Sequence, residues 1–305
     1  MNNIWPNLPY EDWKDSLNTL HLWMQIVGKL KLEQNTFINH WWEVAFFLTA
    51  RGITTGLIPY KNKTFDVTFD FVDHKLIISV SNGKQKVLKL KSQAVKNFYR
   101  EFIQALLDLG INIKINTRPS EITNPIQFTS DTIHKSYDKH AVSNWWRIQL
   151  QVSSILDKFR KNFRGKSSPV FFYWGSFDLN TTRFSGKKLP NKTIWPEGYS
   201  FMHYAENEEN FAAGFWPGDE RFPHPAFYSY IYPAPKDCES INTGPEFSYF
   251  NNKLSECILP YEEVRKIKNP KNEILNFYET TYREFAKLAK WDINEFKTAV
   301  PKKYK

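Results

Sequence analysis

The sequence predicts an α+β protein made of two related halves, each a curved antiparallel sheet of four or five strands backed by helices. Three landmarks occur twice and in the same order: a Phe-Phe pair, a Thr-Thr pair and an Asn-Phe-Tyr triplet. The Phe-Phe pairs begin at Phe46 and Phe171, and the triplets begin at Asn97 and Asn276. Repeated landmarks in a fixed order indicate an internal duplication of one α-β-α unit. We therefore expect two copies of this unit in a pseudo-twofold arrangement.

The chain of 305 residues divides into a first repeat at residues 1–115, a linker at 116–140 and a second repeat at 141–305. A hydrophobic content of 41% supplies enough apolar surface for one compact unit. The spacing between the copies is longer for the triplets than for the Phe-Phe pairs, so the second repeat carries an insertion, which we place at about residues 187–225. Long ordered loops are often functional, and this one is predicted to form a lid; a disordered surface loop is the alternative.

The first half has the pattern of a helix, an antiparallel meander and a closing helix. Apolar residues at every third or fourth position predict a helix over residues 10–32. Strands are predicted at residues 44–50, 53–58, 65–71, 76–80 and 87–90, with Asn82 and Gly83 forming the last hairpin turn. Ser92 is the expected cap of the closing helix, which ends at Gly110.

The second half repeats this order. A helix is predicted at residues 141–163, followed by strands at 169–174, 179–184 and 226–232 and a hairpin within 247–259. Asn269 and Pro270 then begin a closing helix, since proline is favoured in the first turn of a helix.

Charge and cysteine content restrict the classes of function. The net charge of +9 favours an anionic partner, but the basic residues are dispersed, which argues against nucleic acid as the main partner. Cys238 and Cys257 form no zinc or redox motif, and we interpret both as reduced structural thiols. No apolar run is long enough to span a membrane and no signal peptide is recognisable, so we expect a cytoplasmic protein without membrane contact.

The sequence carries no recognisable catalytic motif. The seven histidines form neither HxxxH nor HxH, so no metal site is predicted. Ser176 lies in Trp-Gly-Ser-Phe-Asp, which lacks the second glycine of a nucleophile elbow and argues against a serine hydrolase. No phosphate-binding loop or haem motif is present, so no cofactor is predicted, and whether any reaction is catalysed stays open.

A small-molecule site in a groove between the two repeats is the function that we expect. Polar residues interrupt the most apolar part of each half, and pockets combine apolar walls with a few convergent polar groups. Aromatic walls would hold a sugar-like or nucleotide-like ligand, and an arginine would bind a carboxylate or phosphate, so an anionic ligand is favoured. His21 or Asp178 would serve as acid or base if the ligand reacts. The candidate ligand-binding residues are His21, Gln25, His40, Trp41, Arg51, Trp174, Ser176, Asp178, Arg183, Trp216 and His224.

Other interpretations stay open. A salt bridge from Asp178 to an arginine would tie the halves together without forming a site. The many aromatic residues are also compatible with a structural or protein-interaction module, which is the first alternative function. Nucleic-acid binding is the second alternative, and the sequence does not indicate the oligomeric state.

Several motifs along the chain resemble one bacterial family. They are WPNLPYEDW (5–13), TLHLWMQIVGK (19–29), NHWW (39–42), VDH (72–74), SPVFFYWGSFDL (168–179), TRFSG (182–186) and AGFWPG (213–218). The family is number 5996 among the domains of unknown function, and the resemblance extends over nearly the whole chain. It implies no activity, because the family has no assigned reaction or site.

Overall fold

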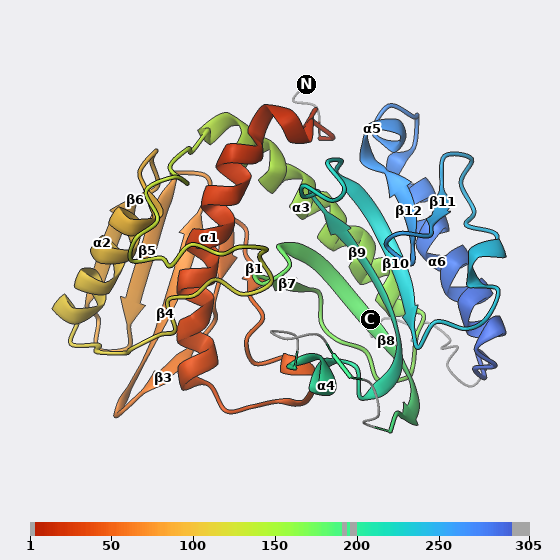
Figure 1. Ribbon diagram of the computed structural model, residues 1–305, viewed down its shortest axis with the longest axis horizontal. Helices are drawn as coiled ribbons and strands as arrows, with labels where there is room; N and C mark the ends of the chain where they lie inside the picture. Colours follow the sequence, from red (N-terminus) through yellow and green to blue (C-terminus); the bar gives the residue numbers. More distant parts are fainter. Residues whose placement is uncertain (1–3, 191–193, 196–199, 295–305) are drawn as a thin grey trace, which may run out of the picture.

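The computed structural model describes residues 4–190, 194–195 and 200–294 and contains two antiparallel sheets with helices packed against them (Figure 1). The first sheet has the strand order β1-β2-β4-β5-β6, with β3 paired to β4. The second sheet has the order β11-β12-β10-β9-β8-β7. This arrangement confirms the predicted α+β class.

The first half follows the predicted order of elements, with shorter strands at its start. The elements are α1 (Tyr10–Gln34), η1 (Asn39–Trp41), β1 (Phe47–Leu48), β2 (Gly52–Thr54), β3 (Ile58–Tyr60), β4 (Lys63–Asp70), β5 (Lys75–Val80), β6 (Gln85–Lys89) and α2 (Val95–Asp108). The strand predicted at 53–58 is split into β2 and β3 because Gly56 turns the chain with a φ of 65°. The prediction that Ser92 caps α2 is wrong: Ala94 is the N-cap residue, and the Ser92 hydroxyl bonds the backbone of Tyr137 instead.

The second half places one strand of its insertion inside the sheet. Its elements are α3 (Lys139–Lys161), β7 (Phe171–Tyr173), β8 (Asp178–Lys188), α4 (Met202–Ala205), β9 (Glu208–Trp216), β10 (Ala226–Tyr232), η2 (Cys238–Ser240), β11 (Tyr249–Asn251), β12 (Glu256–Pro260), α5 (Tyr261–Val264) and α6 (Pro270–Leu288). Because β9 lies between β8 and β10, residues 208–216 of the predicted lid are a central strand instead. Residues 191–193 and 196–199 of the insertion lie outside the described residues.

The two Phe-Phe segments lie side by side and connect the sheets. Phe46 and Phe172 form an isolated antiparallel bridge, with N–H···O distances of 2.9 and 3.0 Å in the two directions. A long helix precedes each sheet and another follows it. The strand orders nevertheless differ, because β9 has no counterpart in the first sheet and because β12, not β11, pairs with β10. The internal duplication and its pseudo-twofold axis therefore stay predictions.

Helices cover one face of the second sheet. In β8, Leu179, Thr181 and Arg183 are buried on the side where α3 and α6 lie (Figure 1). The Arg183 guanidinium is 3.4 Å from the ring centre of Phe159 on α3. Side chains alternate between the two faces of a strand, so Asp178, Asn180 and Thr182 lie on the other face.

A buried lysine attaches α1 to the start of the first sheet. α1 crosses the middle of the molecule (Figure 1), and the Lys31 side chain on it is only 2% exposed. Its Nζ donates hydrogen bonds to the carbonyls of Ala45, at 2.6 Å, and Thr55, at 2.7 Å. Burial lowers the pKa of Lys31 to about 8, so the side chain can hold these carbonyls as a cation at neutral pH.

We predict that Lys31→Met lowers the free energy of unfolding by at least about 2 kcal/mol, because two buried carbonyls lose their charged donor. The measurement is chemical denaturation at pH 7. Lys14→Met on the same helix is the matched control, because Lys14 pairs only with the exposed Glu11. Its effect should be under about 0.5 kcal/mol, and equal losses for the two variants would contradict the anchoring role of Lys31.

Candidate functional site

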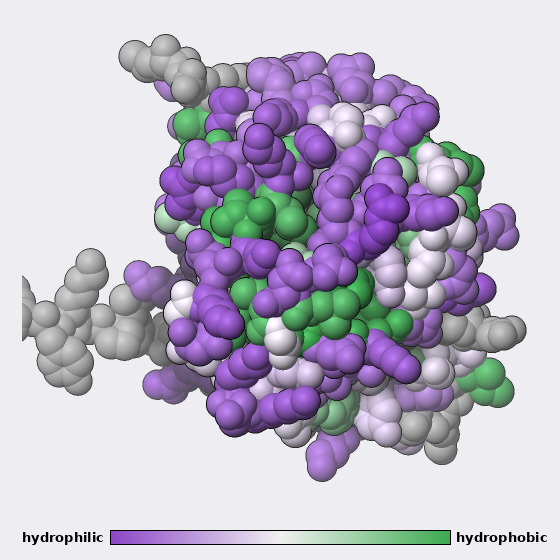
Figure 2. All heavy atoms as spheres, turned by 90° about the vertical axis from the view of Figure 1, so that its left-hand side faces the viewer, coloured by the Kyte–Doolittle hydropathy of each residue, from purple (hydrophilic) through white to green (hydrophobic). Residues whose placement is uncertain are grey.

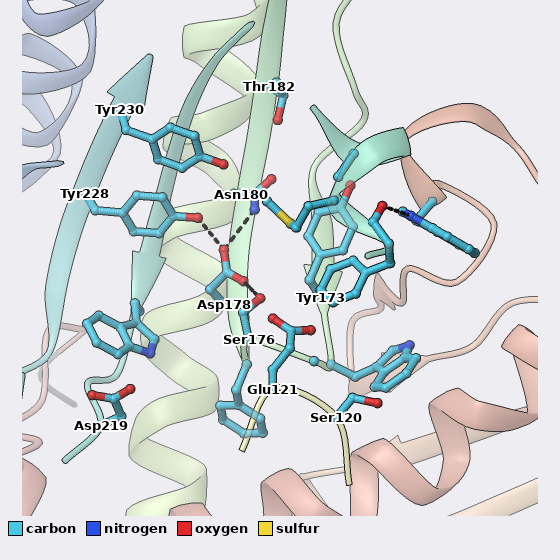
Figure 3. Close-up of a pocket in the computed structure, with 18 of the residues that line it drawn as sticks. Ser120, Glu121, Tyr173, Ser176, Asp178, Asn180, Thr182, Asp219, Tyr228 and Tyr230 are labelled. Carbon is cyan, nitrogen blue, oxygen red and sulfur yellow. Dashed lines mark hydrogen bonds between the residues drawn. The ribbon is translucent and has the colours of Figure 1, made fainter. Parts of the chain in front are cut away.

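The face of the second sheet that α3 and α6 leave uncovered carries polar side chains in rows. Asn180 of β8, Gly214 of β9 and Tyr228 of β10 pair in one row of the register. Thr182 and Tyr230 lie at the ends of the next row. Alternation along β8 and β10 therefore brings hydroxyl, amide and carboxyl groups to one surface (Figure 3).

A cavity of about 660 Å³ lies over this face. Its other walls come from α1 and η1, from the loop at residues 120–121 and from the segment around α4. The cavity thus draws on both halves of the chain. Its polar and aromatic lining includes His21, His40, Trp41, Ser120, Glu121, Tyr173, Trp174, Ser176, Asp178, Asn180, Thr182, Glu206, Trp216, Asp219, Arg221, Tyr228, Tyr230, Lys253 and Glu256.

The carboxyl group of Asp178 accepts three hydrogen bonds at the wall of the cavity (Figure 3). The hydroxyls of Ser176 and Tyr228 donate short hydrogen bonds to its two oxygens, and the Asn180 amide donates a third at 2.8 Å. Burial raises the pKa of Asp178, and the three donors act in the opposite direction by stabilising its charge. Asp178 is therefore held in one orientation by three neutral hydrogen-bond donors.

Gly214 makes room for the contact between Tyr228 and Asp178. A Cβ atom at position 214 would lie 2.6 Å from the Tyr228 hydroxyl and 2.7 Å from Cβ of Asn180. Since β9 lies between β8 and β10, the tyrosine can reach across it only where β9 has no side chain.

Three further carboxyl groups line the cavity, and each comes from a different segment. Burial raises the pKa of Glu121, Glu206 and Glu256 to about 7. After burial, the second-largest cause of the raised pKa of Glu121 and Glu256 is the negative charge of Asp178. Glu121 remains accessible to water inside the cavity, and its carboxyl occupies the space over Gly175 that a side chain there would fill.

His21 lines the cavity as a neutral ring. Its Nε2 lies 2.9 Å from the carbonyl of Gly175 and 3.0 Å from the amide nitrogen of Gln25. Burial lowers the pKa of His21 to about 4. Behind it, Gln25 exchanges two hydrogen bonds of 2.8 Å with the backbone of Ser120 and so positions the loop that carries Glu121.

η1 joins the segment around α4 to the cavity wall. The Trp41 indole donates to the carbonyl of Phe201 at 2.7 Å, and His40 Nδ1 is 3.0 Å from the carbonyl of Ala205. Lys166 Nζ lies 2.7 Å from His40 Nε2 and can only donate, so the ring proton is on Nδ1. His40 and Trp41 both have positive φ, of 65° and 57°, which these contacts stabilise.

The structure brings seven of the eleven predicted residues together around one cavity. They are His21, His40, Trp41, Trp174, Ser176, Asp178 and Trp216. Gln25 is fully buried behind the wall, and His224 does not line the cavity but contacts Phe222 through its ring. The role of these residues in ligand binding stays a prediction.

The two arginines predicted for the site lie elsewhere. Arg51 is bound to Asp70 at 2.7 Å and to Asp73 at 3.0 Å in the first sheet. Arg183 is separated from Asp178 by five positions in one strand, so the two side chains point to opposite faces. Arg183 instead donates to the carbonyl of Phe159 and pairs with Glu279 at 3.5 Å. The predicted salt bridge between Asp178 and an arginine is not formed.

Sequence reasoning missed most of the polar lining. Asn180 and Thr182 follow Asp178 at alternate positions, and Tyr228 and Tyr230 alternate in AFYSYIY, so strand periodicity carried a signal for all four. Glu121 lies in the predicted linker, where no local pattern marks it.

The comparison with protein families gives one match. Residues 5–298 match the family described as "Family of unknown function (DUF5996)". The chain belongs to this family. Membership confirms the resemblance carried by the motifs and assigns no reaction. Neither the curated proteins nor the solved structures gave a match to the chain.

The described residues of this family member contain neither a metal-binding cluster nor a membrane-spanning helix. Within them, no three His, Cys, Asp or Glu side chains converge in a way that would hold a metal ion. No helix in the same part of the chain combines the length and apolar character of a membrane span.

We predict that Gly214→Ala destabilises the protein by about 1–3 kcal/mol through overpacking, because its new methyl group collides with the Tyr228 hydroxyl. In a Tyr228→Phe background the same change should cost less, and a double-mutant cycle in urea measures the difference. Gly186→Ala is the control, since no atom lies within 4 Å of its added Cβ, and its cost should be the same in both backgrounds. Additive effects at Gly214 and Tyr228 would contradict this account.

The raised pKa of Glu256 predicts a pH-dependent stability difference. Its carboxyl has a pKa near its ordinary 4.5 when unfolded and about 7 when folded, so folding favours the protonated form. This contribution is complete below about pH 4.5 and is lost as the pH rises through 7. The melting temperature of Glu256→Gln, relative to the parent, should therefore rise from pH 5 to pH 8. Glu262→Gln should show a constant difference over this range, because Arg265 lowers the pKa of Glu262; a flat profile for Glu256→Gln would refute the prediction.

Proposed function

We propose that this chain binds a small polar molecule in the cavity between α1, η1 and the open face of the second sheet. The observation that carries the proposal is the convergence of Asp178, Tyr228 and Asn180 on a wall of a cavity of about 660 Å³. This volume lies within the range of about 300–1,000 Å³ that is common for ligand pockets. The groups stand on paired strands, so their positions are fixed before a ligand arrives.

The chemistry of the wall favours a ligand rich in hydrogen-bond donors. Ionised carboxylates only accept hydrogen bonds, and four carboxyl groups besides Asp219 face the cavity. Tyr173, Tyr228 and Tyr230 add hydroxyls that can donate or accept, and aromatic faces of the wall can pack against a sugar or another ring. These features support a neutral or cationic polar ligand.

The charge of the wall does not favour the anionic ligand that we expected from the net charge. Five carboxyl groups line the cavity against two cationic side chains, Arg221 and Lys253. Arg221 forms a 2.7 Å ion pair with Asp219 and is 73% exposed, and its charge offsets part of the burial effect on the pKa of Glu121 and Glu256. An anion would have to approach several carboxylates of its own sign, which costs free energy in a cavity that partly excludes water.

The alternative of a protein-interaction module has less support. Figure 2 shows the face that carries the first sheet and α2; its surface is mainly hydrophilic, and its apolar residues form separate patches. Continuous apolar patches are what mark many interaction surfaces. Nucleic-acid binding stays untested.

The test is a thermal-shift screen of the parent against a library of neutral, cationic and anionic metabolites. A ligand at about 100 times its Kd adds about 2.7 kcal/mol of stability and so raises the melting temperature. Tyr230→Phe and Asp178→Asn should each lose most of the shift, measured against their own melting temperatures. Asp157→Asn, at an exposed position on α3, is the matched control and should keep it. A library without any compound that stabilises the parent would reject the proposed function, as would a ligand whose effect survives in both cavity variants.

A further inference from the structure

The inner cavity carries carboxyl groups that have no basic side chain in direct contact within the described part of the chain. Glu121, Asp178 and Glu256 form no ion pair within 4 Å with a described Lys, Arg or His. The neighbouring histidines do not supply a cation, because burial lowers the pKa of both His21 and His40. Arg221 acts on Glu121 and Glu256, and Lys29 on Glu121, through their charges from beyond ion-pair distance. These carboxyl groups therefore leave room for a basic group in direct contact with them.

The acceptors around Asp178 also exceed the donors. The Asn180 amide nitrogen is used in its hydrogen bond to Asp178, and its Oδ1 is buried without a hydrogen-bond partner among the described residues. An unsatisfied buried acceptor costs about 1–3 kcal/mol. A ligand that carries several N–H donors would pair with the carboxylates, whereas a ligand that only accepts would leave them unpaired.

Aromatic rings stand beside these acceptors on the same sheet face. The rings of Tyr228 and Tyr230 are nearly parallel, with centroids 6.2 Å apart, and both hydroxyls point toward the cavity (Figure 3). Trp216 lines the same cavity from β9, next to Phe215, which pairs with Leu179 of β8. The faces of Tyr and Trp rings attract cations electrostatically.

Resting on the proposed function, we propose that the ligand of this cavity is a small organic cation with primary ammonium groups, such as a polyamine or an amino sugar. Each ammonium group has three donors and no acceptor, which matches a wall in which carboxylates and an amide oxygen face inward. Glu121, Asp178 and Glu256 line the cavity from three separate segments, and Figure 3 shows the carboxyl groups of Glu121 and Asp178. Arg221 and Lys253 lie at exposed positions. The proton that Glu121 and Glu256 hold near pH 7 would leave when a cation binds beside them.

The experiment compares probes that differ mainly in charge, by isothermal titration of the parent at pH 7.5 and low salt. Glucosamine, glucose and glucose 6-phosphate share one ring and are cationic, neutral and anionic; spermidine represents the polyamines. We expect binding of glucosamine or spermidine at least tenfold tighter than that of glucose, and no binding of glucose 6-phosphate. The stronger of the two amines identifies the ligand type.

Matched variants connect this preference to the cavity. Glu121→Gln and Glu256→Gln keep the shape of the side chain and should weaken amine binding at least tenfold each. Glu262→Gln, at a site paired with Arg265 outside the cavity, should leave it unchanged. Melting temperatures show that each variant is folded.

The outcomes separate this inference from the proposed function. Tighter binding of glucose or glucose 6-phosphate than of both amines, lost in Asp178→Asn, would overturn the cationic ligand and leave the cavity as a binding site. Equal amine binding by the parent and both Gln variants would also overturn it. If none of the four probes binds but the library screen yields neutral or anionic ligands, the cationic ligand is overturned and the proposed binding function stands. If no compound of the library binds, the cationic ligand and the proposed binding function are both rejected.

Discussion

A carboxylate buried on a sheet face must find hydrogen-bond donors, and this requirement organises the second sheet around Asp178. A buried unpaired carboxylate would cost several kcal/mol, so the chain supplies donors from three positions: Ser176 before the strand, Asn180 within it and Tyr228 two strands away. The tyrosine reaches Asp178 only because the intervening strand has Gly214 in that row. The insertion that contributes β9 therefore supplies both the central strand and the gap through which the network closes.

Helix α1, in the first half of the chain, positions part of the cavity wall. Gln25 and Lys29, one turn apart on α1, both hydrogen-bond to Ser120, with Lys29 Nζ 2.9 Å from its hydroxyl. This fixes a loop without regular secondary structure close to β8, where the Glu121 carboxyl lies over Gly175. Trp174 packs flat against α1 at Gly28, where a Cβ would come within 2.3 Å of the indole. The helix thus positions both the loop that carries Glu121 and the Trp174 side chain, and both line the cavity.

The predictable part of this molecule is the part governed by local periodicity. The stripe of α1, the alternation of β4 and the Asn82-Gly83 turn are local patterns, and the structure contains these elements within a few residues of their predicted bounds. The alternation of side chains along a strand also places Asp178 and Arg183 on opposite faces of β8, and Asp178 and Asn180 on the same face. By contrast, Glu121 enters the cavity through contacts with a helix almost a hundred residues away, and no local pattern encodes such a contact. The same holds for β9, whose place between β8 and β10 depends on which edge offers free backbone groups.

The difference between the net charge and the charge of the cavity follows from where each is screened. The formal charge of +9 belongs largely to dispersed lysines and arginines, whose fields decay over a Debye length of about 8 Å at physiological ionic strength. A ligand inside the cavity would be closer to Glu121, Asp178 and Glu256 than to most of that surface charge. The field that a ligand experiences is therefore set by a few lining residues, and a basic protein can present an acidic site. This is why composition predicted an anionic ligand while the geometry of the wall favours a cation.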